Sequence, residues 1–210
     1  MNKNDKQGII IAVVLAVLLI AFIVFYVLTD DGTTYHLEPL AILGIVLGGV
    51  LLVCLVAICV MAIVIASKFK RVVKCYNNKA YREVVEKYDY FAKLRPSQIK
   101  DAALLTIAVS YLELGDDERF CSISSQVNHK NVLIAKYFWQ AVYAIGKNDA
   151  NEFLRCQDLV TQSTNNNRKD KYVTMLDIVY KYNCQQYQLT ESDKQLICSF
   201  NSDFIKTLVE

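Results

Sequence analysis

Two long apolar runs without a charged residue lie near the start of the chain, at residues 8–28 and 40–66. About 20 helical residues cross the ~30 Å hydrocarbon layer of a bilayer, so each run is long enough to span a membrane. The second run is longer and would span with some tilt. Helices buried in a protein core are rarely so long and so free of polar side chains. The sequence therefore predicts two transmembrane helices joined by a short extracytoplasmic loop at residues 29–39.

The first run is not typical of a cleaved signal peptide, whose apolar region usually covers about 7–15 residues. Residues 8–28 exceed that length, and the following "TDDGTTYH" offers no cleavage site of small residues. We therefore expect the first run to be retained as a transmembrane helix.

Lysine and arginine bias the flanks of transmembrane helices toward the cytoplasm. Two lysines lie within residues 1–7, the predicted loop 29–39 has neither Lys nor Arg, and four basic residues follow the second run: Lys68, Lys70, Arg71 and Lys74. Both termini of this integral, multi-pass membrane protein should therefore be cytoplasmic. The four basic residues either only enforce the topology or also contact anionic lipid headgroups, each contributing about 1 kcal/mol near the surface. A composition rich in Lys, Asn, Ile and Tyr is typical of AT-rich genomes and favours a bacterial plasma membrane.

The remaining part of the chain, residues 67–210, lacks the features of several function classes. It carries 21 Lys and Arg against 17 Asp and Glu, and the four juxtamembrane cations account for the excess, so no basic face for nucleic acid is predicted. The seven cysteines form no CxxC, and His129 has no neighbouring ligand at metal-binding spacing. We therefore expect reduced thiols and neither a metal nor another cofactor. Catalytic and nucleotide-binding motifs are absent from the sequence, so we do not expect an enzyme.

From about residue 65, the chain divides into units with a period near 34 residues. The clearest unit, "DAALLTIAVSYLELGDDERFCSISSQV", places Ala108 where two antiparallel helices would cross and Gly115 at the turn between them. Units at "NNKAYREVVEKYDYFAKLRPSQ" and "KYFWQAVYAIGKNDANEFLRCQDLV" share this spacing. The pattern resembles the tetratricopeptide repeat (TPR) over residues 65–167. Cys75, Phe120 and Phe153 depart from it, since the family has a tyrosine at the first position and small residues at the other two.

The resemblance implies an all-α domain at residues 67–210, built as a TPR-like array of antiparallel helix pairs. A helix at "KDKYVTMLDIVYKYN" follows the repeats, and a last helix at "TESDKQLICSFNSDFIKTL" begins with Thr190 and Asp193, a capping-box pair. We expect this last helix to cap the array, because a repeat array must cover its terminal face. The apolar pattern resumes at Phe69 without an intervening Gly or Pro, so one helix should run from Pro39 through Tyr76.

In TPR arrays the leading helices line a concave face, and the matching positions in this chain are all apolar. The candidate partner-binding residues are Leu105, Val109, Leu112, Phe138, Val142 and Ile145. Two interpretations are open at this point. Either the C-terminal helices fold over this face as part of the core, or the face is an open groove for a hydrophobic segment of a protein partner.

Small residues at four-residue spacing occur in both apolar runs, at Ala12 and Ala16 and at Gly44 and Gly48. They allow close helix packing, either within one hairpin or between copies of the chain in a homo-oligomer. We therefore predict a scaffold anchored in the lipid bilayer that presents a TPR-like domain to the cytoplasm for an unidentified protein partner. The alternative is a self-associating structural membrane protein whose soluble helices only stabilise it.

Overall fold

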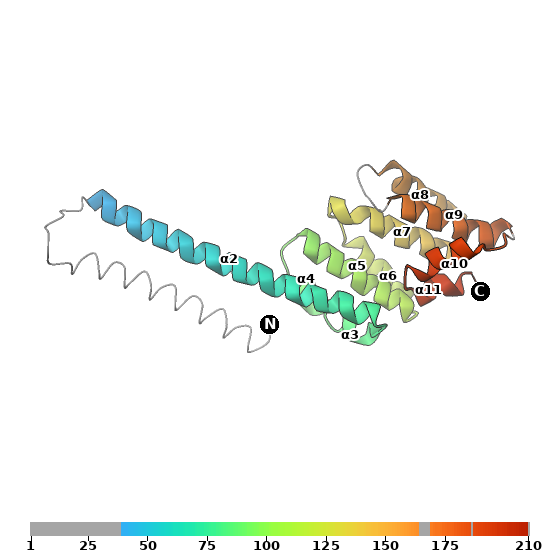
Figure 1. Ribbon diagram of the computed structural model, residues 1–210, viewed down its shortest axis with the longest axis horizontal. Helices are drawn as coiled ribbons and strands as arrows, with labels where there is room; N and C mark the ends of the chain where they lie inside the picture. The colour runs from blue at the N-terminus through green and yellow to red at the C-terminus, as the bar shows by residue number, and fades with distance from the viewer. Residues whose placement is uncertain (1–38, 164–168, 186, 210) are drawn as a thin grey trace. The chain divides into compact units, whose positions relative to one another are not determined.

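The computed structural model describes residues 39–163, 169–185 and 187–209, and the regular elements in these ranges are all α-helices (Figure 1). The predicted all-α class is therefore confirmed for this part of the chain. The first apolar run, with Ala12 and Ala16, lies outside the described residues. The helices are α2 (Pro39–Asn77), α3 (Tyr81–Val85), α4 (Tyr88–Ala92), α5 (Gln98–Glu113), α6 (Asp117–Ser125), α7 (Lys130–Gly146), α8 (Ala150–Gln162), α9 (Lys169–Gln185), α10 (Glu191–Cys198) and α11 (Asp203–Thr207).

A single long helix, α2, covers the second apolar run and continues through the basic stretch that follows it. Among the described residues, α2 is the one helix that is long and apolar enough to cross a membrane, judged by length and composition alone. The chain divides into two compact units between Lys68 and Phe69, and every helix from α3 onward belongs to the second unit. Large apolar side chains are exposed along the first part of α2: Leu47, Val50, Leu51, Leu52, Leu55, Val56, Ile58, Met61 and Ile63.

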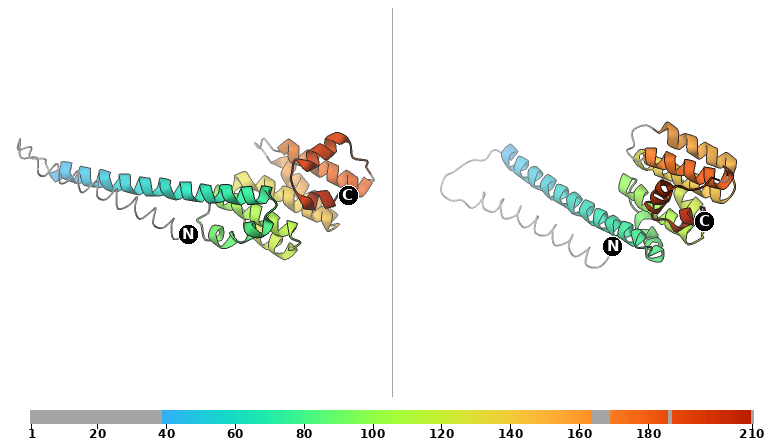
Figure 2. Two further views of the ribbon diagram at one scale, coloured as in Figure 1. Left: turned by 60° about the horizontal axis from the view of Figure 1, so that its bottom comes forward. Right: turned by 45° about the vertical axis from the view of Figure 1, so that its right-hand side comes forward.

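Helices α5 to α8 form two successive pairs, α5 with α6 and α7 with α8, and α5 also packs against α7 (Figures 1 and 2). The second helix of each pair begins with an aspartate, Asp116 before α6 and Asp149 before α8, whose side chain accepts a hydrogen bond from a backbone N–H in the first turn. These caps satisfy donors that a helix leaves unpaired. Gly115 and Asn148 have positive φ angles of 78° and 56°, which end the preceding helices.

The stretch after α2 contains two short helices, α3 and α4. Val84 and Phe91 lie at helical spacing, and both side chains are fully buried. A turn at residues 86–87 nevertheless separates α3 from α4. The turn leaves a gap in the packing of these helices against α5 and α6, which is described below as a cleft.

Two hydrophobic clusters form the interior of the second unit. One gathers α5 and α6 with α3 and α4, and it contains Ala108, which is fully buried. The other gathers α7, α8 and α9 and contains Phe138 and Phe153. Phe204 of α11 packs against both clusters, so α11 connects the two halves of the core.

The two helices predicted after the repeats begin where the sequence places them. In α9, apolar side chains at helical spacing are buried, with Tyr172, Met175 and Leu176 in the second cluster. At the start of α10, Thr190 and Asp193 form the predicted capping box, in which each side chain accepts a hydrogen bond from the other residue's backbone N–H.

The prediction of one continuous last helix is wrong, because its residues form α10 and α11. The first of these helices ends at Cys198 and the second begins at Asp203. Between them, Asn201 has a positive φ angle of 50°, a conformation that Asn adopts more readily than most residues. Ser202 then caps the new helix, since its hydroxyl oxygen accepts a 3.1 Å hydrogen bond from the Ile205 backbone N–H. Asn followed by Ser therefore breaks the helical run.

Candidate interaction surface

The six candidate partner-binding residues lie on α5 and α7, and all of their side chains are buried. Three belong to the first hydrophobic cluster and three to the second. A partner could therefore reach them only where another segment of the chain moves aside. Their exposed fractions are 6% for Leu105, 2% for Val109, 2% for Leu112, 0% for Phe138, 0% for Val142 and 8% for Ile145.

Part of the cover over this face is the stretch of residues 199–209, which we call the α11 segment. Its Phe200 stacks on Phe138 with the ring centroids 5.1 Å apart, and Tyr172 of α9 stacks on Phe138 at 4.6 Å. Phe204 packs against both hydrophobic clusters, and Ile205 is fully buried. Aromatic and aliphatic side chains of the α11 segment thus cover apolar residues of α5 and α7.

The close approach of the α11 segment to α7 depends on a glycine. Gly146 is the last residue of α7, and a Cβ atom there would lie 3.0 Å from Cζ of Phe204 and 3.2 Å from Cδ2 of Leu208. Carbon atoms that are not bonded are normally about 3.5–4.0 Å apart. The missing side chain therefore makes room for the two apolar residues of the segment.

A carboxylate of α5 holds the first turn of α11. Glu113 is the last residue of α5, and its Oε2 accepts hydrogen bonds from the backbone N–H groups of Asp203 at 3.0 Å and Phe204 at 2.9 Å. The first N–H groups of a helix have no acceptor inside the helix, so a carboxylate at this place satisfies two of them. Glu113 therefore recognises the backbone of the segment, whatever side chains those two residues carry.

Three further polar contacts hold the α11 segment to other parts of the unit. They are an ion pair of Lys79 with Asp203, a 2.9 Å hydrogen bond from Asn201 Nδ2 to the Asn77 carbonyl, and a 2.9 Å hydrogen bond from Asn183 Nδ2 to the Leu208 carbonyl. The first two contacts join residues 124 positions apart in the chain. Because the ion pair is substantially exposed, we expect it to add little stability.

Burial controls the electrostatics around Glu113. Desolvation raises the pKa of its carboxyl group, and hydrogen bonds from Ser202 and from the Phe204 backbone only partly oppose this shift. Burial also raises the pKa of Tyr76 and of Tyr81, and the nearby Glu113 charge adds to both shifts. The Tyr81 hydroxyl is buried without a hydrogen-bond partner among the described residues. The contact between α5 and the α11 segment is thus polar but incompletely paired.

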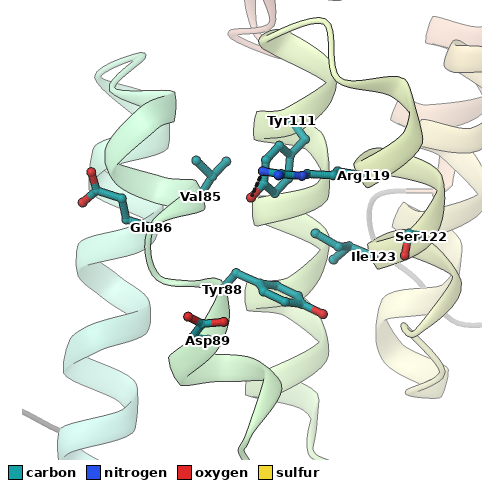
Figure 3. Close-up of a pocket in the computed structure, with 8 residues that line it drawn as sticks. All are labelled: Val85, Glu86, Tyr88, Asp89, Tyr111, Arg119, Ser122 and Ile123. Atoms are coloured by element: carbon teal, nitrogen blue, oxygen red, sulfur yellow. Dashed lines mark hydrogen bonds between the residues drawn. The ribbon is translucent and has the colours of Figure 1, made fainter.

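A second surface feature is a cleft of about 410 Å³ beside the turn between α3 and α4 (Figure 3). Tyr111 and Arg119 lie at one end of it, and Tyr88 and Asp89 lie at the other. Arg119 Nη1 donates a 3.2 Å hydrogen bond to the Tyr111 hydroxyl, and the guanidinium lies 5.1 Å from the centre of that ring. Asp116 pairs with the same guanidinium. The cleft is lined by Val85, Glu86, Tyr88, Asp89, Tyr111, Arg119, Ser122 and Ile123.

Sequence reasoning missed both the cleft and the role of Glu113. The cleft depends on the turn at residues 86–87, which the helical spacing of the flanking residues conceals. The arginine in the cleft already pairs with a tyrosine and an aspartate, so its position is explained by contacts within the chain. The α11 segment is the more informative feature, since it shows which chemistry the face of α5 and α7 accepts.

The other predicted site residues within the described ranges lie on α2. The side chains of Lys70, Arg71 and Lys74 are exposed, and that of Lys68 is half-buried. Gly44 lies within the helix, and a Cβ atom added to Gly48 would have no described atom within 4 Å. The helix surface at Gly48 is therefore open to a close neighbour.

Within the described ranges, no three His, Cys, Asp or Glu side chains gather in a way that could hold a metal ion. Function must therefore be inferred from the fold and the contacts above. Comparisons of the chain with protein-family models, with curated proteins and with solved structures found no match.

Proposed function

We propose that this chain is a membrane-anchored interaction module. Two transmembrane helices, at residues 8–28 and 40–66, hold a TPR-like helical domain on the cytoplasmic side of the membrane. Both termini lie on that side, and the domain binds a segment of a protein partner.

The exposed apolar surface of α2 supports the anchor. Soluble monomers rarely expose large apolar side chains along several successive helical turns, as α2 does from Leu47 to Ile63. Lipid would remove this surface from water, with a gain of about 25 cal/mol for each Å² of apolar area. The exposed cations Lys70, Arg71 and Lys74 follow the apolar stretch, at the distance along the chain where anionic headgroups would lie.

The observation that carries the interaction function is the α11 segment itself. A short helix with aromatic and aliphatic side chains covers the apolar face of α5 and α7, in the way that a helical peptide fills a groove. Phe138, one of the candidate partner-binding residues, is in direct contact with Phe200 of that segment. The face that the TPR resemblance assigns to a partner therefore accepts a peptide-like segment within this chain.

The test compares the full chain with a chain that ends at Lys74 and so keeps the basic residues that set the orientation, each carrying the same affinity tag, in membranes of the cells that the protein comes from. Both chains are cross-linked in the membrane, purified in detergent and analysed by quantitative mass spectrometry. We expect a second protein to be recovered with the full chain and lost with the anchor alone. Equal recovery with both chains, or recovery of further copies of the same chain only, would favour the self-associating alternative instead.

A matched control separates insertion from interaction. Alkaline extraction should leave both chains in the membrane pellet, because the apolar runs are present in each. Release of the full chain into the supernatant would contradict the anchor, whatever the cross-linking shows.

A further inference from the structure

We infer that the α11 segment is a releasable latch over the partner's site, and that the partner supplies a segment of the same chemistry. Such a segment forms a short helix with Ser, Thr, Asp or Asn as its N-cap. An aromatic residue follows two positions after the cap, and aliphatic residues follow three and six positions after it. In this chain those places are held by Ser202, Phe204, Ile205 and Leu208. The inference rests on the proposed function and specifies its partner.

The latch docks through contacts that a separate peptide could reproduce. Ile205 is fully buried, and Phe204 reaches both hydrophobic clusters, so these two side chains are the anchors. Glu113 accepts the backbone N–H groups at the start of the helix, which every helical peptide presents. The site therefore selects for a helix start followed by apolar residues at fixed positions.

Gly146 and Lys79 further restrict which side chains a docking peptide can carry. The space left by the glycine is filled by Phe204 and Leu208, which favours a large apolar residue at the second and sixth positions after the cap. Lys79 pairs with Asp203, the residue directly after the cap, so an acidic residue is weakly favoured there. An acidic residue in a first helical turn also suits the helix dipole.

The connection to α10 provides a pivot for release. Asn201 holds a positive φ angle of 50° between the two helices, and it is the residue at which the chain changes direction. Rotation about this residue can separate α11 from α5 and α7 while α10 keeps its own capping box. This rotation uncovers the parts of α5 and α7 that Phe204 and Leu208 contact, whereas Phe138 stays covered by Phe200 and Tyr172.

Not every buried polar group at the contact with the latch has a hydrogen-bond partner, and this favours local opening of the latch. The hydroxyl of Tyr81, close to Glu113 and Asp203, is buried without a partner among the described residues. Buried polar groups that lack a partner destabilise the state that buries them. Elements with such contacts belong to the less stable parts of a structure and open before the whole unit unfolds.

The experiment uses a fluorescent peptide of residues 199–210 as the probe. It is added to the full chain and to a chain that ends at Cys198, both purified in the same detergent, and binding is followed by fluorescence anisotropy. We expect the shortened chain to bind the peptide at least about tenfold more tightly than the full chain, because the latch competes for the same face. A peptide with Phe204→Ala and Ile205→Ala should not bind either chain.

Two variants of the shortened chain locate the binding site. Gly146→Val places a branched side chain where Phe204 and Leu208 dock, so the peptide should bind at least about tenfold more weakly. Ser125→Ala, on the exposed surface of α6, is the matched control and should bind like the unaltered shortened chain.

Three outcomes would overturn the latch. The shortened chain could fold, as judged by circular dichroism, and yet fail to bind the peptide. It could also fail to fold, in which case the segment is an integral part of the core. Finally, two copies of the full chain could exchange their α11 segments within a dimer and bind no added peptide. The partner would then be a second copy of the chain.

Hydrogen exchange on the full chain gives an independent measurement that needs no deletion. Amides of α11 should exchange at least about tenfold faster than those in the middle of α5, since the latch opens by itself. Equal protection of the two helices would contradict a releasable latch. Neither result affects the membrane extraction or the cross-linking, so the latch and the proposed function can fail separately.

Discussion

The Glu113 carboxylate at the end of α5 accepts a hydrogen bond from the backbone N–H of Phe204, which lies 91 residues further along the chain. This contact connects the end of α5 to the segment that covers apolar residues of α5 and α7. It also brings a charged group into a mostly apolar environment. The first two predictions test what this residue contributes.

Replacing Glu113 with alanine should destabilise the second unit. Two backbone N–H groups at the start of α11 lose their acceptor, and relief of the buried charge offsets only part of that loss. We expect the free energy of unfolding to fall by about 1–3 kcal/mol. Thermal and denaturant unfolding of the full chain in detergent provide the measurement. Asp158→Ala, at an exposed position of α8, should leave stability unchanged, and an equal effect of the two substitutions would contradict the role of Glu113.

Glu113 should also make stability depend on pH, and the sign follows from its raised pKa. The folded chain keeps the Glu113 proton at pH values where the unfolded chain has released it. The contribution of Glu113 to stability is therefore greatest at low pH and falls as the pH rises above about 4.5, the ordinary pKa of the group, until the raised pKa is passed.

Glu113→Gln isolates this effect, because the amide oxygen still accepts hydrogen bonds but cannot titrate. Lys79, Asp203, Tyr76 and Tyr81 face the same place and are present in both chains, so their contributions largely cancel in the difference. The stability of the wild type relative to Glu113→Gln should decrease between pH 4 and pH 8, as measured by denaturant unfolding in ~1-unit steps of pH. A difference that stays constant or increases with pH would contradict the raised pKa.

The space at Gly146 allows a third prediction. Gly146→Val should lower the free energy of unfolding by about 1–3 kcal/mol, because the added side chain collides with Phe204 and Leu208. Gly146→Ala should have a smaller effect, since the clash of one methyl group is offset by the better helix propensity of alanine, about 1 kcal/mol. Gly48→Val is the control and should not change unfolding of the second unit, as no described atom lies within 4 Å of its Cβ position. If Gly146→Val and the wild type are equally stable, the result contradicts the close packing of α11 on α7.

Much of this fold could be predicted from local sequence patterns. The periodic apolar residues of α5 and α9, the turn at Gly115 and the capping box at Thr190 all depend on neighbours within a few positions. Helical periodicity and capping report such short-range relationships directly. Ala108, a small residue within the periodic pattern of α5, is fully buried in the first hydrophobic cluster.

The features that the sequence concealed depend on contacts between distant residues. Glu113 is a charged residue at a helix end, a place where most such side chains face solvent, and nothing in its neighbourhood indicates a partner 91 positions away. The break at Asn201 had a local signal, because Asn followed by Ser is typical of a turn and a new N-cap. The apolar residues on either side of Asn201 keep helical spacing. Because of that spacing, the sequence analysis predicts one continuous helix despite the turn signal at Asn201 and Ser202.

The last prediction concerns the orientation of the chain in the membrane. Lys68, Lys70, Arg71 and Lys74 follow the second apolar run, so this end of α2 should face the cytoplasm. In a chain whose native cysteines are replaced, Thr33→Cys should react with a membrane-impermeant maleimide in intact cells. Ser125→Cys, at an exposed position of α6, should react only after lysis. Labelling of Ser125→Cys in intact cells, with protection of Thr33→Cys, would reverse the orientation and place the helical unit outside the cytoplasm. Labelling of both sites in intact cells would contradict the two-span anchor, because the two positions would then lie on the same side of the membrane.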